Sequence, residues 1–285
     1  MGKIHTYKSK MLSLKKLKQE IMKTINKIFI SAVIIVVMGF VASCSKSDGT
    51  IGTDNPKNSP DGKSGSTARI IIKGDYLYAV DNSSLKVVDI STPSNPSYVR
   101  SVEIGFGIET IYTFGDYLFI GSNLGIYIYG LSDPSNPNQL SQFEHFTACD
   151  PVIASDTLAF VTLRNNNVCN QWIVASREID VLNVKDIFHP YQLVNYIPQF
   201  DPYGLDRLNN YLFVCHGTDG VVVYDINKMI AGYGNAVIST ITGITAFDAV
   251  IWQNKLFVIG ESGFYQYDYS DIHNISLISS ILKNQ

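Results

Sequence analysis

The sequence predicts an all-β chain made of five small antiparallel sheets, and three observations lead to that prediction. Hydrophobic residues make up 46% of the 285 residues and charged residues 16%, with 17 Tyr and 14 Phe. Aromatic and β-branched residues suit pleated, half-buried strands. A turn with Asp or Asn at a fixed place recurs about every 42 residues. The segments between these turns are short apolar runs, so the pattern is typical of a repeat architecture built from strands.

The repeat becomes visible when the chain is aligned on its turns. Each unit contains four strand signals. In the first unit, residues 68–72 and 76–80 flank a Gly-Asp turn, and residues 85–90 and 98–104 flank a second turn. Two hairpins in a row predict a four-stranded antiparallel sheet of the kind that forms a propeller blade. The shared turn position recurs after 41, 40, 54 and 44 residues and is held by Asp75, Asp116, Asp156, Asn210 and Asn254.

The second turn of each unit carries a repeated proline-rich phrase. It reads "STPSNP" at residues 91–96 and "SDPSNP" at 132–137. Proline fixes φ and lacks a donor, so a strand cannot continue through the phrase. Later copies read "KDIFHP" at 185–190 and "SDIHNI" at 270–275. We therefore expect the phrase to be a structural turn between the third and fourth strands.

The second strand of each unit is a near-continuous apolar run, as expected for a strand covered by neighbouring sheets on both sides. A β-helix or a stack of small sandwiches would also repeat. However, a β-helix coil is shorter than this period, and no interdomain linker follows residue 68. The sequence therefore favours a β-propeller of four-stranded antiparallel blades over residues 68–285, with five blades. It leaves open how the ring closes.

At this level of detail the chain resembles a known family. The segments "LKVVDISTPSNP" (85–96), "IDVLNVKDIFHP" (179–190) and "VVVYDINK" (221–228) are similar to the LVIVD repeat, a β-propeller family common in lipoproteins of Bacteroidetes. The similarity is strong in the first two units and weak in the fifth. The family has no established catalytic residues, so the resemblance implies a fold and a cellular surface but no reaction.

The N-terminus reads as a bacterial lipoprotein signal. Basic Lys23 and Lys27 precede the apolar stretch 28–43, which ends in small residues directly before Cys44. By this resemblance Cys44 receives a diacylglycerol and becomes the first residue of the mature protein. A plain transmembrane anchor is the alternative, but the stretch is shorter than the roughly 20 residues a spanning helix needs. Residues from Met22 form a complete signal by themselves, so we expect translation to start there.

A polar tether is expected to follow the lipidated cysteine. Residues 45–67 are rich in Ser, Gly, Asp, Asn and Pro and cannot form a core. The resemblance to bacterial lipoproteins implies, by their sorting rule, that Ser45 after the cysteine favours the outer membrane over the inner one. From Cys44 onward the chain has 14 basic and 24 acidic residues, a net charge of −10 compared with −3 for the whole chain. Such a balance argues against nucleic acid as a partner.

The remaining cysteines fall into two kinds. Cys149 and Cys169 bracket the first hairpin of the third unit. In an oxidising compartment they are candidates for a disulfide, and two buried thiols are the alternative. Cys215 lies inside an apolar run and is expected to be a buried small side chain, not a nucleophile.

No catalytic or metal-binding motif is present. The five His are scattered, without a pair at metal-ligand spacing, so we expect neither a catalytic residue nor a metal ligand set. Acids and a tyrosine do recur where the innermost strands begin, near the central channel. They could hold a structural cation or a polyhydroxylated ligand, or they could simply line a solvated channel and cap turns. The candidate ligand residues are Glu109, Asp150, Tyr203 and Asp248, with Asp206 and Arg69 in related places.

Two functions remain open at this stage. The first is a non-enzymatic scaffold in the cell envelope that binds a protein or a glycan, with no cofactor. The second is a carbohydrate-active enzyme that uses the channel carboxylates. Absent motifs and the expected lipid anchor favour the first.

Overall fold

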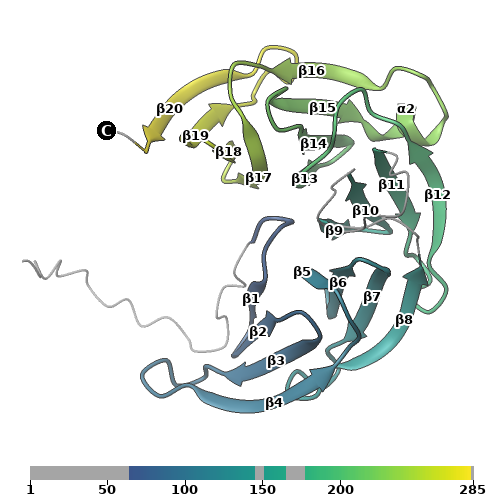
Figure 1. Cartoon of the computed structure of the whole chain (residues 1–285), viewed down its shortest axis with the longest axis vertical. Coiled ribbons are helices and arrows are strands. Elements are labelled where there is room, and N and C mark those ends of the chain that lie inside the picture. The colour runs from purple at the N-terminus through teal and green to yellow at the C-terminus, as the bar shows by residue number, and fades with distance from the viewer. Residues whose placement is uncertain (1–63, 145–150, 165–176, 284–285) are drawn as a thin grey trace, which may run out of the picture. The chain divides into compact units, whose positions relative to one another are not determined.

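The computed structural model describes residues 64–144, 151–164 and 177–283, which form five four-stranded antiparallel sheets arranged in a ring (Figure 1). Every sheet takes four strands that are consecutive in the chain, so within these residues no blade borrows a strand from another. The predicted five-bladed propeller is confirmed. The blades are β1(Ile70–Lys73), β2(Tyr76–Val80), β3(Ser84–Asp89), β4(Ser97–Glu103); β5(Ile108–Phe114), β6(Tyr117–Ser122), β7(Gly125–Gly130), β8(Asn138–Glu144); β9(Val152–Ser155), β10(Leu158–Leu163), β11(Glu178–Asn183), β12(Tyr191–Tyr196); β13(Leu205–Leu208), β14(Tyr211–Cys215), β15(Val221–Asp225), β16(Val237–Ile241); and β17(Ala246–Trp252), β18(Lys255–Gly260), β19(Gly263–Asp268), β20(Ser276–Leu282).

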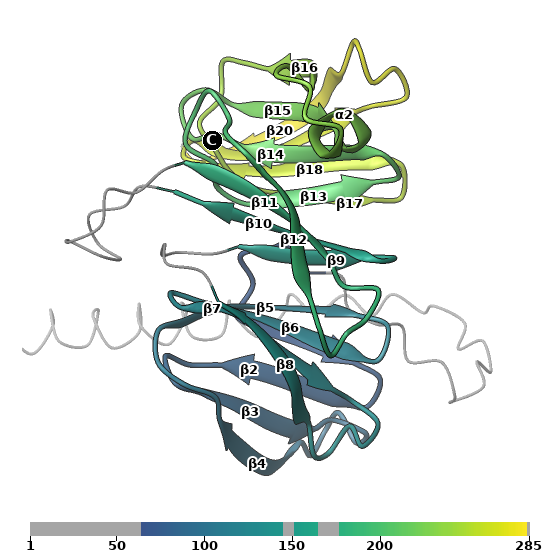
Figure 2. The ribbon, with the colours of Figure 1, turned by 90° about the vertical axis from the view of Figure 1, so that its right-hand side faces the viewer.

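The first strand of each blade lies toward the centre of the ring and the fourth lies at the outside (Figure 1). Seen from the side, the blades follow one another as stacked sheets (Figure 2). The inner strands start at one end of the ring, here called the mouth, and the first hairpin turns lie at the opposite end. In blade 1 this turn pairs Lys73 with Tyr76, and Gly74 has φ +57°, as the expected Gly-Asp hairpin requires.

The repeated proline-rich phrase is the turn between the third and fourth strands, as predicted. An Asp side chain accepts a backbone N–H two residues later: Ser91 on Asp89 at 2.8 Å, and Phe188 on Asp186 at 3.0 Å. In the copy at residues 270–275, Asp271 likewise accepts from the His273 N–H at 3.0 Å. The turns also hold the blades together, because the Tyr78 hydroxyl of blade 1 donates to a main-chain carbonyl in the turn of blade 2 at 2.8 Å.

Blade 4 departs from this rule. The short helix α2 (Ile226–Ile230) replaces the turn, and Asp225 caps its N-terminus by accepting from the Lys228 N–H at 3.1 Å. The segment lacks the prolines found in the first two copies, so the backbone can continue into a helical turn. The acid of the repeat is kept and takes on the capping role.

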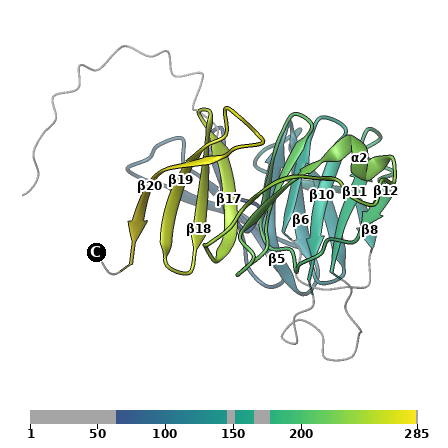
Figure 3. The same cartoon turned by 90° about the horizontal axis from the view of Figure 1, so that it is seen from above.

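Four hydrophobic clusters hold the ring together, and each joins two consecutive blades: 1 with 2, 2 with 3, 3 with 4, and 4 with 5. The central strands β6, β10 and β14 are therefore buried on both faces, as predicted. In β2 and β18 burial alternates instead, because the described residues contain no such cluster between blade 5 and blade 1. The prediction of two covered faces is thus wrong for the two end blades. Figure 3 shows β17–β20 as one end of the arc.

A short segment before β1 links the ends of the arc from the inside. The Ser66 hydroxyl donates to Asp248 of blade 5 at 3.0 Å, and Ser66 Oγ accepts from the Leu205 N–H of blade 4 at 2.7 Å. The Ala68 carbonyl accepts from the Ile111 N–H of blade 2 at 2.8 Å. The sequence places Ser66 in the polar tether, yet the structure buries it completely. These hydrogen bonds connect the segment before β1 to blades 2, 4 and 5 without an exchanged strand.

Candidate functional site

The candidate site lies at the mouth, where the inner strands begin. Equivalent positions in three blades are held by Glu109 in β5, Tyr203 before β13 and Phe247 in β17, and Arg69 lies close by, before β1. The register of β5 shifts between Ile108 and Thr110, and that of β17 shifts between Ala246 and Asp248. Glu109 and Phe247 are therefore the extra residues of two β-bulges. Bulges redirect side chains and often lie beside functional sites.

Arg69, Arg164 and Glu109 form one group of charges at the mouth. Burial raises the pKa of the half-buried Glu109, and the positive charges of Arg164 and Arg69 oppose that shift. The Arg69 guanidinium donates to the Ile108 carbonyl at 2.9 Å, which fixes it between blades 1 and 2. The Arg164 guanidinium lies over the Tyr203 ring, 4.3 Å from its centroid.

Beside these charges lies an aromatic-lined cavity of about 390 Å³ between blades 4 and 5. The Tyr203 and Phe247 rings are 5.9 Å apart at 50°, and Phe200 lines the cavity as well. Aromatic walls with a few polar groups are typical of small-molecule pockets. The charged residues that line it are Arg177, Asp201, Asp219 and Glu261.

His216 forms the buried base of this cavity. Its Nδ1 lies 3.1 Å from the Phe200 carbonyl, and its Nε2 lies 3.0 Å from the Tyr224 hydroxyl. Desolvation lowers the pKa of His216 to about 4, so the ring is neutral at pH 7. A neutral ring donates from Nδ1 to the carbonyl and accepts from the tyrosine at Nε2. It thereby holds the backbone that carries Phe200.

Two of the predicted acids face the protein's own chain. Asp248 accepts from the Ser66 hydroxyl, from the N–H and hydroxyl of Thr67, and from the Ala249 N–H. Burial nevertheless raises the pKa of Asp248, because those donors only partly replace its lost hydration. Asp206 accepts from the Ile251 N–H at 2.6 Å. Both carboxylates stabilise junctions between strands.

The structure therefore brings Glu109 and Tyr203 together at the mouth and commits Asp248 to the segment before β1. Asp150 lies outside the described residues, as do Cys44, Cys149 and Cys169. Cys215 is fully buried, as expected, and burial raises the pKa of its thiol. In the described part of the chain, no three His, Cys, Asp or Glu side chains are placed to hold a metal ion. A ligand role for the four candidate residues stays a prediction.

Several residues of this site escaped the sequence analysis. Phe247 holds the same place in its unit as Glu109 does in the second, so an alignment of inner strands could have found it. Arg164 directly follows β10, and a basic residue after an apolar run gives no such signal. In the sequence His216 is one of five scattered histidines, and its role follows only from its hydrogen bonds.

Among the residues that the structure describes, no helix is long and apolar enough to cross a membrane.

Comparison with known proteins agrees with this architecture. The LVIVD repeat matches residues 64–103 and 109–144, which are the first two blades. The chain therefore contains LVIVD repeats, and the first match includes the buried segment around Ser66. No curated protein matches the sequence.

Solved structures show the same fold at low sequence identity. A functionally unknown protein from Desulfotomaculum acetoxidans matches with a TM-score of 0.58 and 11% identity, covering 74% of this chain and 68% of that one. The computationally designed Ika8 protein matches with a TM-score of 0.53 and 14% identity, covering 74% and 60%. A hypothetical selenium-binding protein from Sulfolobus tokodaii gives 0.51 and 15%, covering 73% and 61%. The chain thus spans about three fifths to two thirds of these propellers, and the likeness concerns the fold alone.

Proposed function

We propose that the propeller is a non-catalytic binding module, and that its mouth binds a glycan. The observation that carries this proposal is the cavity of about 390 Å³ lined by Tyr203, Phe247 and Phe200. Flat aromatic rings pack against the apolar C–H faces of sugar rings, and the surrounding carboxylates and Arg177 can hydrogen-bond hydroxyl groups. A protein partner is the competing possibility for the same surface.

The state of the acids supports binding over catalysis. Glycoside hydrolysis needs two carboxyl groups on either side of the scissile bond. Asp248 and Asp206 already accept hydrogen bonds from the protein itself. Glu109 is the residue that favours the enzymatic alternative, because a carboxyl with a raised pKa suits a general acid.

A glycan array followed by titration calorimetry tests the proposal. We expect Phe247→Ala to weaken binding roughly tenfold or more, since loss of a large apolar contact costs about 1.5 kcal/mol or above. Phe188→Ala is the matched control, because Phe188 is exposed in the blade 3 turn at the opposite end of the ring. The proposal fails if no glycan binds, or if both variants bind alike.

Analysis of the products separates the two functions. A binding module leaves its glycan intact. Hydrolysis that is lost in Glu109→Gln, with binding retained, would establish the enzymatic alternative instead.

We further propose that the module belongs to a bacterial envelope lipoprotein, held in the outer membrane by lipid on Cys44. The signal-like residues 23–44 support this. Mass spectrometry of the mature N-terminus should find a diacylglyceryl cysteine, and Cys44→Ser should release the protein from membranes. An unmodified Cys44 in a mature protein would refute the anchor.

A further inference from the structure

Each blade carries an aromatic residue at the third position of its second strand. In the first four blades this side chain is at most 1% exposed, because the following blade covers it. In blade 5 the equivalent residue is only half-buried. The five residues are Tyr78, Phe119, Phe160, Phe213 and Phe257.

This aromatic defines what we call the forward face of a blade, and the opposite side is its backward face. At the junction of blades 4 and 5, the forward residues Phe213 and Val223 pack against the backward residues Leu256 and Val258. The junctions of blades 1 with 2, 2 with 3, and 3 with 4 are built in the same way. A forward face is therefore a surface whose established partner is a backward face.

Among residues 64–144, 151–164 and 177–283, no such partner covers the outer part of the forward face of blade 5. Phe257 stacks on Phe264 of the same blade, with ring centroids 5.6 Å apart at 18°. Next to them, Ile259 is 55% exposed and Ile281 is 71% exposed. The residue equivalent to Ile259 in blade 4 is Cys215, which is fully buried.

Within the described part of the chain, the backward face of blade 1 is likewise uncovered. Leu77 and Ala79 are half-buried, whereas their equivalents in blade 5, Leu256 and Val258, are completely buried. Beside them on the inner strand, Ile70 is 57% exposed. Each end of the arc thus presents one half of a junction that the chain forms four times internally.

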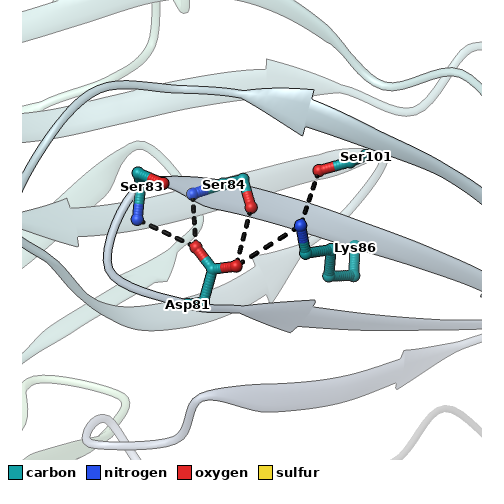
Figure 4. Close-up of polar contacts among 5 residues, drawn as sticks. All are labelled: Asp81, Ser83, Ser84, Lys86 and Ser101. Atoms are coloured by element: carbon teal, nitrogen blue, oxygen red, sulfur yellow. Dashed lines mark hydrogen bonds and ion pairs between the residues drawn. The ribbon is translucent and has the colours of Figure 1, made fainter.

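The charges on the backward face of blade 1 do not prevent another protein surface from covering it. Lys86 lies on the backward face, where its ammonium is 3.4 Å from Asp81 and donates to the Ser101 hydroxyl at 2.9 Å (Figure 4). Asp81 also accepts from Ser83 and Ser84, and these hydrogen bonds hold its pKa well below the usual range. A partner surface would therefore enclose a paired charge, which is far less costly than an isolated one.

The chain's own blade 1 does not cover blade 5. The segment around Ser66 lies between their inner strands, and at Gly65 a Cβ atom would strike Asp248 and contact Val250 of β17. Val250 pairs with Phe257 and so belongs to the forward face. The segment fills the inner part of the gap, and no other described residue covers the outer part of either face.

We propose that the forward face of blade 5 is a docking site for the backward face of blade 1 of a second copy of this chain. The contact is head-to-tail and continues the blade-to-blade packing of the chain across two molecules. Such contacts close into rings or extend as filaments, according to the rotation between copies.

Sedimentation velocity of the full chain in detergent tests the contact. We expect masses of two copies or more that fall toward one copy on dilution. Ile259→Asp places an unpaired charge in the docking site and should weaken self-association roughly tenfold or more. Phe188→Asp is the control, an exposed apolar residue outside both faces, and should self-associate like the wild type. A single-copy mass at all concentrations overturns the proposal.

Cross-linking distinguishes two copies from closure of one ring. Copies carrying Ile259→Cys are mixed with differently tagged copies carrying Ile70→Cys, and the chain without introduced cysteines gives the background. We expect a disulfide-linked product that contains both tags. A chain that carries both substitutions is the comparison. If only this chain cross-links, and the product is a monomer with an internal disulfide, the faces close on each other within one molecule and the proposal is wrong.

Discussion

Asp248 offers the sharpest test of how the ring is held together, because one carboxylate joins the segment before β1 to blade 5. Replacing it with alanine leaves the buried Ser66 hydroxyl and the Ala249 N–H without this acceptor. Each buried donor left unsatisfied costs about 1–3 kcal/mol. Thr67 also loses an acceptor, but it is exposed and water can replace the bond.

These losses are partly offset, because the substitution also removes a buried charge whose pKa is raised by desolvation. We therefore expect Asp248→Ala to lower the free energy of unfolding by about 3 kcal/mol. Asp248→Asn keeps one acceptor oxygen and the volume while removing the charge, so it should cost about 1 kcal/mol or less.

Urea denaturation, followed by tyrosine and tryptophan fluorescence, measures both free energies. Asp201→Ala is the control, because it removes an exposed carboxylate that lines the aromatic cavity at the mouth. Protease cleavage near Ser64 should accelerate in Asp248→Ala alone. The reasoning is refuted if Asp248→Ala matches the wild type within about 0.5 kcal/mol, or if the asparagine variant is as unstable as the alanine variant.

Three further predictions concern stability. The folded pKa of His216 is about 4, below its usual 6.5, so between these values only the unfolded chain binds this proton. The free energy of unfolding should therefore decrease as pH falls through this window, by up to about 3 kcal/mol, and the decrease should be smaller in His216→Gln when urea unfolding is measured at each pH. Tyr78→Phe should cost about 1 kcal/mol in urea denaturation, because it removes the hydroxyl bond to blade 2 but keeps the aromatic ring that the other blades carry here; no change would show that water replaces the bond. Gly220→Ala should lower the melting temperature more than Gly232→Ala does: both glycines have positive φ, but only at Gly220 would a Cβ collide with the Ile241 carbonyl, so equal effects would contradict the argument.

Repetition explains why so much of the fold could be predicted from the sequence. A turn at Asp75 and its equivalents, followed by short apolar runs, fixes the number of strands per unit and their antiparallel order. The proline-rich phrase fixes where the third strand ends. These are local signals, and five copies reinforce one another.

The contacts that close the ring and shape the mouth left no comparable signal. Ser66 and Asp248 are 182 residues apart, and Ser66 lies in a stretch whose composition indicates a tether. The bulges at Glu109 and Phe247 depend on the register of two strands, which composition and spacing do not determine. Glu109 and Asp248 both lie near the start of an inner strand, and the sequence does not distinguish the buried Asp248, which binds the segment before β1, from the half-buried Glu109.

The path of the segment before β1 also bears on where the proposed module would hold its ligand. Ser64 lines a second cavity, of about 400 Å³, together with Lys73, Phe114 and Ser155, which are the last residues of three inner strands. Glu109 and Phe247 lie near the first residues of theirs. The chain therefore enters the ring at the end opposite the mouth and passes along its centre before β1 begins. The segment from Ser64 to Ala68 thus occupies the central path, so a ligand would be held at the mouth without passing through the ring.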